Sequence, residues 1–220
     1  DVCSSDLMKD MKGCIFDLDG TLVDSMWVWR DLGEVYLKAK GIPAAGNLSE
    51  ILRPMTMKAA ILYLKEAYAI EDSFLQMSEE VYAIVRHRYQ HEVAAKQGAE
   101  DCLRKLKAKG VRMGVLTACE RISAEQVLRR CGLLPYFDFV ASCEELPYDK
   151  QDGRLYEYIV RKLKTDPKET MFVEDALHAV KALKENGYHV TAVYDAANQA
   201  QWKEICCLAD EALDSLKQVE

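Results

Sequence analysis

The sequence predicts an α/β protein with a parallel sheet, interrupted after its first strand by an all-helical segment. Short apolar runs alternate with helix-like segments that end at glycine, and residues 26–94 show helical periodicity almost without β-branched runs. Parallel strands need long crossover connections, so strands that alternate with helices indicate a parallel sheet with helices on both faces. The expected architecture is a Rossmann-like core with an inserted α-helical domain.

The core begins with residues 13–16, an apolar run that leads into an acidic, glycine-containing loop. Further apolar runs predict the remaining strands, at residues 111–116, 137–142, 170–173 and 190–193. Helices are expected between them, at residues 101–109, 122–131, 155–163 and 176–186. Gly110, Gly132 and Gly187 follow three of these helices, which suits the role of glycine at helix C-termini.

Residues 26–94 are predicted to form the inserted helical domain. Helical periodicity is clear in 59–64 and 81–85, where apolar residues recur at helical spacing. Residues 11–25 and 95–217 then make up a discontinuous core domain.

Composition excludes several classes of protein. Half of the 220 residues are hydrophobic and 30% are charged, which is typical of a globular chain. The formal net charge of −7 argues against nucleic acid as a partner, whereas a few local lysines and backbone N–H groups can still bind one small phosphorylated ligand. No apolar run approaches the roughly 20 residues that span a bilayer, so no membrane association is expected.

The eight cysteines include no CxxC pair and no cluster at zinc-binding spacing. Cys206 and Cys207 are adjacent, which is poor geometry for a disulfide, and Cys14 and Cys143 lie in apolar runs where a thiol behaves as a small hydrophobe. Free thiols predict a reducing, cytoplasmic location. Residues 1–10 are polar and without pattern, and we expect them to be a tag or a disordered segment.

Two acidic residues, Asp17 and Asp19, follow the first predicted strand. In an open parallel sheet ligands bind beyond the carboxyl ends of the strands, so these residues lie where a site is expected. A carboxylate there can attack phosphorus, and a second one can protonate the leaving oxygen and later activate water. The alternative is a purely structural role, in which Asp and Gly residues form a turn without catalytic function.

The segment Asp17-Leu18-Asp19-Gly20-Thr21-Leu22-Val23-Asp24-Ser25 resembles the first motif of the haloacid dehalogenase superfamily of phosphotransferases. The resemblance implies that Asp17 is the nucleophile and Asp19 the general acid/base. It also covers later strand ends. Thr117 and Ala118 resemble the second motif and Lys150 the third, which together would bind phosphate, and Glu174-Asp175 resembles the acidic fourth motif.

The resemblance implies a Mg²⁺ site formed by Asp17, Asp19, Glu174 and Asp175, whose hard oxygen atoms suit that cation. Two adjacent acids could instead favour a helix N-terminus. The chain also departs from the family. It has Gln151 where the family often has Pro after the third-motif lysine, and Ala176 and Ala179 where Ser and Gly are frequent around the fourth motif.

In this family a helical insertion is a cap that closes over the site and selects the substrate. Arg53 and Trp27 are the cap residues with a candidate role in specificity, although Arg53 could be a solvated charge and Trp27 a core aromatic. A capped enzyme of this size is expected to be a monomer.

The motif pattern is similar to that of β-phosphoglucomutases and sugar-phosphate phosphatases. The mutases carry a cap histidine at a position that is Trp29 here. The sequence therefore favours a Mg²⁺-dependent phosphatase that hydrolyses a small phosphorylated metabolite, a sugar phosphate, through an aspartyl-phosphate. A sugar phosphomutase is the alternative, and a haloacid dehalogenase and a non-catalytic binding protein on the same scaffold are less favoured.

Overall fold

The computed structural model describes residues 11–53 and 55–219. These fall into two compact units, one containing the chain up to Asp24 and from Val93 onward, and one containing Ser25–Glu92. We name the first the core domain and the second the helical unit. The tag or disordered segment predicted at residues 1–10 lies outside the described residues.

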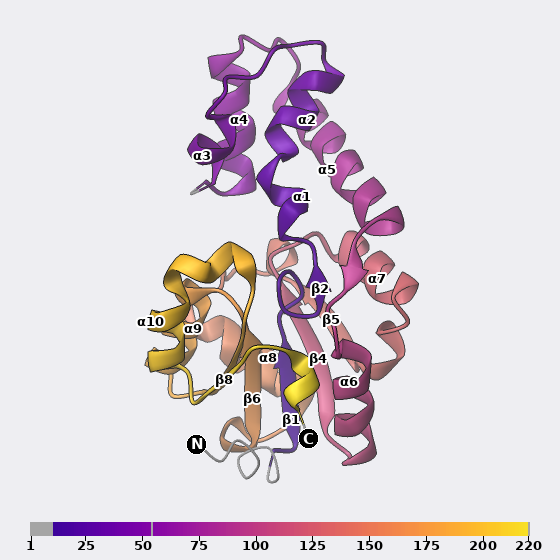
Figure 1. The fold of residues 1–220 in the computed structure, drawn as a ribbon, viewed down its shortest axis with the longest axis vertical. Helices are drawn as coiled ribbons and strands as arrows, with labels where there is room; N and C mark the ends of the chain where they lie inside the picture. The colour runs from indigo at the N-terminus through magenta and orange to yellow at the C-terminus, as the bar shows by residue number, and fades with distance from the viewer. Residues whose placement is uncertain (1–10, 54, 220) are drawn as a thin grey trace. The chain divides into compact units, whose positions relative to one another are not determined.

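A parallel sheet forms the centre of the core domain. Among the described residues its six strands lie in the order β5-β4-β1-β6-β7-β8 (Figure 1). They are β1 (Gly13–Phe16), β4 (Arg112–Thr117), β5 (Phe139–Ser142), β6 (Thr170–Glu174), β7 (His189–Val193) and β8 (Glu211–Leu213). Phe16, at the end of β1, pairs with Val115 on one side and Val173 on the other. The predicted parallel α/β sheet is confirmed.

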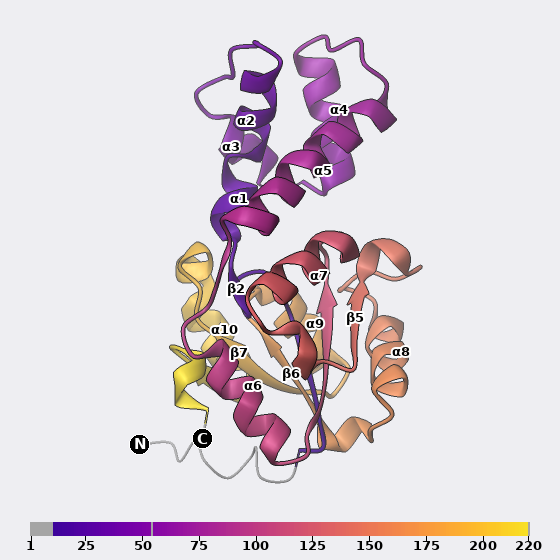
Figure 2. The ribbon, with the colours of Figure 1, turned by 90° about the vertical axis from the view of Figure 1, so that its right-hand side faces the viewer.

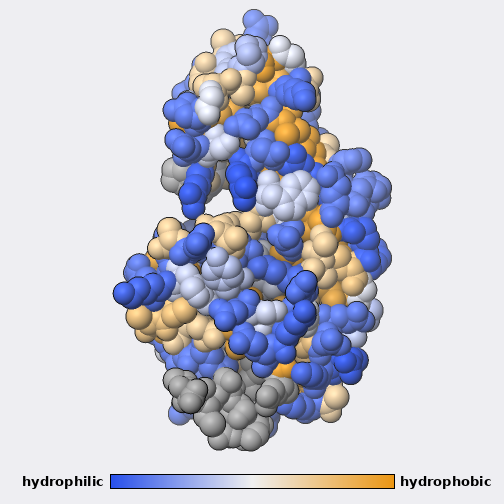
Figure 3. Space-filling view, in the orientation of Figure 1, coloured by the Kyte–Doolittle hydropathy of each residue, from blue (hydrophilic) through white to orange (hydrophobic). Residues whose placement is uncertain are grey.

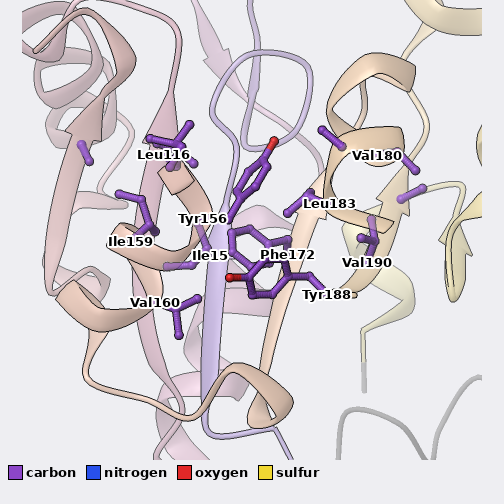
Figure 4. Close-up of a cluster of buried hydrophobic side chains, with 14 of the residues drawn as sticks. Ile15, Leu116, Tyr156, Ile159, Val160, Phe172, Val180, Leu183, Tyr188 and Val190 are labelled. Atoms are coloured by element: carbon purple, nitrogen blue, oxygen red, sulfur yellow. The ribbon is translucent and has the colours of Figure 1, made fainter. Parts of the chain in front are cut away.

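Helices cover both faces of this sheet (Figure 2). They are α6 (Ala99–Ala108), α7 (Arg121–Arg130), α8 (Gly153–Leu163), α9 (Leu177–Glu185) and α10 (Trp202–Leu208). Buried side chains of α8, α9 and α10 form one hydrophobic cluster with Ile15, Phe172 and Val190 of the sheet (Figure 4). Within it, Tyr156 of α8 meets Phe172 edge-on, with 5.4 Å between ring centroids. This rigid packing fixes the strand ends that carry the polar residues described below.

The sheet is one strand longer than predicted, because β8 pairs with the end of β7. The predicted strand at residues 137–142 starts later, at Phe139, since a 3₁₀ turn, η2 (Leu134–Tyr136), with a proline in its first turn, precedes it. Phe137 packs edge-on against Phe16, with 6.0 Å between ring centroids. Its apolar character therefore reflects core packing rather than membership of a strand.

A short antiparallel pair accompanies the sheet in the core domain. It joins β2 (Val23–Asp24) and β3 (Ala94–Ala95), with Val23 opposite Ala95. These two strands lie at the points where the chain leaves the core domain and returns to it. Two-residue strands are too short to produce a period in the sequence, and the sequence did not indicate them.

The helical unit contains α1 (Met26–Arg30), α2 (Leu32–Ala39), α3 (Leu48–Leu52), α4 (Met57–Ala67) and α5 (Phe74–His91). The hydroxyls of Thr56 and Ser73 cap α4 and α5, each accepting a backbone N–H at 3.2 Å. On α5 the residues Met77, Val81 and Val85 recur at helical spacing and are buried. The segment is helical, as its periodicity predicts.

Hydrophilic side chains cover much of the face seen in Figure 3. The large apolar side chains that are exposed among the described residues lie on helices, and they are Leu62, Phe74, Leu75, Ile122 and Tyr158. Scattered apolar side chains of this kind are ordinary on a globular surface. Within residues 11–53 and 55–219, no helix has both the length and the apolar character required to cross a membrane.

Candidate active site

The carboxyl ends of the central strands bring together the polar residues that the motifs single out. Asp17 directly follows β1, Thr117 ends β4, Glu174 ends β6 and Asp175 follows it. Lys150 reaches the same edge from the segment between β5 and α8. Parallel strands end at one edge of the sheet, which explains how residues more than 150 positions apart in the chain can meet.

Three buried carboxylates lie at the centre of this edge. One oxygen each of Asp17, Glu174 and Asp175 lies within 4.8 Å of the others. The three residues are only 8%, 3% and 2% exposed, respectively. Burying negative charge at this density is costly unless a cation compensates it.

Lys150 supplies part of the compensation. Its ammonium forms ion pairs with Asp17 and with Glu174, the latter at 2.7 Å. The hydroxyl of Tyr156 donates to the Lys150 carbonyl oxygen at 2.5 Å, so the core helix α8 anchors the loop that carries the lysine. Burial by itself would lower the pKa of Lys150, but the charges of Asp17 and Glu174 outweigh it and hold the pKa above its usual range.

One ammonium cannot neutralise three carboxylates, and the pKa values of Glu174 and Asp175 are both raised. Burial, followed by the charge of Asp17, raises the pKa of Glu174 to about 7. Burial, followed by the charge of Glu174, raises the pKa of Asp175 well above its ordinary value. A divalent cation at this point would favour the ionised forms and reverse both shifts. Three carboxylate ligands and excess negative charge fit a hard cation such as Mg²⁺.

The Asp175 carboxylate is held at both of its oxygens. Thr21 donates its hydroxyl to Oδ1 at 3.3 Å, and the side-chain amide of Asn198 donates to Oδ2 at 2.7 Å. Gly20 adopts a positive φ of 86° and lies so close that a side chain there would collide with this carboxylate. Sequence reasoning missed Asn198, whose only signal is its position after a strand that ends at the same edge of the sheet.

The carboxylate of Asp19 is not among the three of this group. Instead its Oδ2 accepts a hydrogen bond from the Thr117 hydroxyl at 3.5 Å, the outer limit for such a bond. Thr117 is fully buried, and its oxygen also accepts the N–H of Cys119 at 2.9 Å. The next residue, Ala118, is exposed in the loop after β4. The metal role predicted for Asp19 stays a prediction.

Arg53 and Trp27, the predicted specificity residues, both belong to the helical unit. Arg53 is exposed and ends α3 as its C-cap residue. The ring of Trp27 lies beneath the guanidinium of Arg88, 5.1 Å from the ring centroid. This cation–π contact gives Trp27 a packing role within the helical unit.

The chain belongs to the haloacid dehalogenase-like hydrolases, because the model of that family matches residues 11–193. The resemblance seen in the sequence motifs is thereby confirmed. The match begins two residues before β1, extends to the end of β7 and includes every site residue that the motifs predict.

Two relatives with different activities and one solved structure resemble the chain. It is 24% identical to a phosphorylated carbohydrates phosphatase of Thermotoga maritima, over 80% of the chain and 82% of the relative. It is 26% identical to an (S)-2-haloacid dehalogenase of Pseudomonas putida, over 83% of the chain and 84% of the relative. The crystal structure of a putative beta-phosphoglucomutase from Thermotoga maritima superposes with a TM-score of 0.78 at 23% identity, covering 95% of this chain and 96% of that one. Because one fold carries several reactions, the site residues must decide between them.

Proposed function

We propose that the protein is a Mg²⁺-dependent phosphatase that hydrolyses a small phosphorylated metabolite, a sugar phosphate, through an aspartyl-phosphate. The observation that carries the proposal is the group of three buried carboxylates at the carboxyl edge of the sheet, two of which form ion pairs with Lys150. Such a group needs a cation to balance its negative charge. It is therefore suited to bind a phosphorylated ligand together with that cation. The phosphatase among the relatives supports the same reading.

The carboxylates of Asp17, Glu174 and Asp175 would hold the cation. When bound, Mg²⁺ would neutralise part of the negative charge of the site and of the phosphoryl oxygens, which lowers the repulsion between nucleophile and substrate. Lys150 would stabilise negative charge on the transferred phosphoryl group. Thr117, at the end of β4, and Ala118, in the loop after it, would contact the same group.

Asp17 and Asp19 divide the covalent chemistry. An oxygen of Asp17 attacks phosphorus, the new P–O bond forms, and the bond from phosphorus to the leaving oxygen breaks while Asp19 gives that oxygen its proton. The resulting Asp19 carboxylate then takes a proton from water, whose oxygen attacks the same phosphorus and releases Asp17 and inorganic phosphate.

Two alternatives are less well supported. A sugar phosphomutase would be expected to carry a cap histidine where this chain has Trp29, and that ring packs edge-on against Tyr89 with 6.1 Å between centroids. A haloacid dehalogenase lacks the second acid of the first motif and needs no metal, whereas Asp19 is present here and Asp17, Glu174 and Asp175 form an acidic group.

Location and assembly complete the proposal. All seven cysteines within the described residues are free thiols, which supports a reducing cytoplasm. We propose that the helical unit acts as the cap, with Arg53 and Trp27 as candidate specificity residues, and that the enzyme is a monomer without a nucleic-acid or membrane partner.

The test measures phosphate release from a panel of phosphorylated sugars and other small metabolites, with Mg²⁺ present and with Asp17→Asn as the control. The panel contains β-glucose 1-phosphate, for which formation of glucose 6-phosphate is followed separately, and an (S)-2-haloacid, for which halide is measured. Release of phosphate by the wild type alone supports the proposal. Isomerisation without phosphate release would identify a mutase, and halide release would identify a dehalogenase. The absence of product in every assay would overturn the proposal.

A further inference from the structure

Asn198 touches the candidate metal site from outside every motif of the sequence. It lies in η5 (Ala196–Gln201), the 3₁₀ segment that follows β7, and its Nδ2 donates to Asp175 Oδ2 at 2.7 Å. We propose that Asn198 is a positioning residue that orients the Asp175 carboxylate for the divalent cation. The inference rests on the proposed function, because it deepens the metal site on which that function depends.

The amide must present its nitrogen to Asp175, because an ionised carboxylate can only accept hydrogen bonds. Thr21 engages the other oxygen, so each carboxylate oxygen has one protein donor and keeps lone-pair capacity for a cation. Gly20 closes the space beside Oδ2. The carboxylate plane is therefore fixed by two donors and one close contact, and Asn198 makes the shorter of the two hydrogen bonds.

The backbone that carries Asn198 is fixed independently of the site. Asp195 is buried, its carbonyl oxygen accepts the N–H of Asn198 at 3.0 Å, and its side chain accepts the N–H of Ala197 at 2.8 Å. The ammonium of Lys96 binds the other oxygen of Asp195 at 2.7 Å and the carbonyl oxygen of Tyr194 at 3.0 Å. Asn198 thus extends from an anchored turn and does not need Asp175 to hold its place.

Lys96 connects this turn to the first-motif loop as well, since its own N–H donates to the Leu22 carbonyl oxygen at 2.9 Å. The chain of contacts runs from Lys96 to Asp195, through the turn to Asn198, and on to Asp175. Removing Lys96 loosens the turn but leaves the amide in place. We therefore expect its effect on cation binding to follow that of Asn198 and to be smaller.

The experiment compares Mg²⁺ affinity, measured by calorimetry on EDTA-treated protein, across a matched set of variants. Asn198→Ala removes the donor, Asn198→Leu removes it while keeping similar bulk, and Asn198→Gln restores a donor on a longer side chain. Gln199→Ala is the control, because it deletes an exposed amide from the same turn. Melting temperatures in EDTA verify that each variant is folded.

We expect Asn198→Ala and Asn198→Leu to weaken Mg²⁺ binding by roughly tenfold, in line with the effect of removing partners of metal ligands. Asn198→Gln and Lys96→Ala should fall between them and the wild type, and Gln199→Ala should match the wild type. The concentration of Mg²⁺ for half-maximal phosphate release should rise by the same factor, while the rate at saturating Mg²⁺ changes little.

Wild-type Mg²⁺ affinity in both Asn198→Ala and Asn198→Leu would overturn the inference and leave the proposed function standing. Weakened affinity in Gln199→Ala by the same factor would also overturn it, because the effect would then belong to the turn rather than to the donor. Wild-type protein that does not bind Mg²⁺ at all would overturn the metal site and the inference together.

Discussion

Each unit of the molecule contains a cluster of paired charges, and the two clusters differ in whether their positive and negative charges balance. In the helical unit, the guanidinium of Arg88 forms two hydrogen bonds with Asp31, at 2.6 and 3.2 Å, and one with the carbonyl oxygen of Val28 at 3.0 Å. In the core domain, Lys150 forms ion pairs with Asp17 and Glu174, and the carboxylate of Asp175 lies in the same group. The first cluster neutralises itself, whereas the second has an excess of negative charge.

This difference separates an element of structure from a candidate site. A one-to-one pair with good geometry can hold helices together, although its net contribution to stability is small. An unbalanced group of buried charges costs free energy in the protein without its ligand. Groups of this kind are found at functional sites, where the bound ligand compensates the charge. We therefore expect substitutions in the core cluster to alter turnover and cation binding, and substitutions in the Arg88 cluster to alter stability while leaving cation binding unchanged.

The largest effect is expected from Asp17→Asn, which removes the proposed nucleophile while keeping the size of the side chain. Phosphate release should fall by about 10⁴-fold or more, as found when nucleophiles of covalent enzymes are removed. The measurement is phosphate release under saturating substrate and Mg²⁺, with the melting temperature as the control for folding. Turnover near the wild-type rate in a folded variant would refute the assignment of Asp17.

A smaller loss is expected from Asp19→Asn, because general acid–base catalysis contributes about 10²- to 10⁴-fold. Both the formation and the hydrolysis of the aspartyl-phosphate should slow, since the same carboxyl serves each step in turn. Single-turnover kinetics separate the two steps, and a substrate with a good leaving group should rescue only the first. An unchanged rate across the pH range would rule out the acid/base role.

The charge imbalance also predicts how pH and Mg²⁺ affect stability. Burial, followed by the charge of Asp17, raises the pKa of Glu174 to about 7 from its ordinary value of 4.5. An acid that binds its proton more tightly in the folded chain stabilises the fold at low pH, and this contribution is lost as the pH rises from the unfolded value through the folded one. Metal-free protein should therefore lose stability between these two pKa values.

Mg²⁺ favours the ionised carboxylates, so it should raise the melting temperature more at pH about 8 than at pH about 5.5. At saturating Mg²⁺ we expect a rise of about 5 °C or more at the higher pH. Melting curves with EDTA and with Mg²⁺ test this, and Glu174→Gln, which lacks the titrating group, should show a flatter pH dependence. Equal shifts at both pH values would contradict the prediction.

The sequence indicated the central strands, the helical segment and the motif residues, because each depends on local patterns that survive in the fold. A buried apolar run ending in Asp17 marks both a strand and a candidate site, and Glu174-Asp175 repeats the arrangement at the end of β6, the strand next to β1. What the sequence could not indicate depends on contacts across the sheet. Asn198 lies in a polar turn of ordinary composition, and only the end of β7 brings it to Asp175.

Weak local signals explain the other omissions. The three residues of β8 become a strand because β7 offers them an edge, and the apolar Phe137 serves the core and not a strand. At Trp27 the sequence pattern is ambiguous, since an aromatic residue at helical spacing suits either a pocket or a packed interior. Its stacking with Arg88 is a contact over 60 residues of sequence that no local pattern contains.

The smallest effect on catalysis is expected from Arg88→Ala, which breaks the balanced cluster of the helical unit. Asp31 is 42% exposed, so water compensates much of the lost pairing, and we expect a loss of about 1–2 kcal/mol in the free energy of unfolding. The Mg²⁺ affinity of the core domain should stay at the wild-type value, because the substitution leaves the three carboxylates unchanged. Urea unfolding of Arg88→Ala, Asp31→Asn and the double variant measures the coupling between the two side chains. If Arg88→Ala weakened Mg²⁺ binding as strongly as Asn198→Ala, charge balance would not distinguish structure from site in this protein.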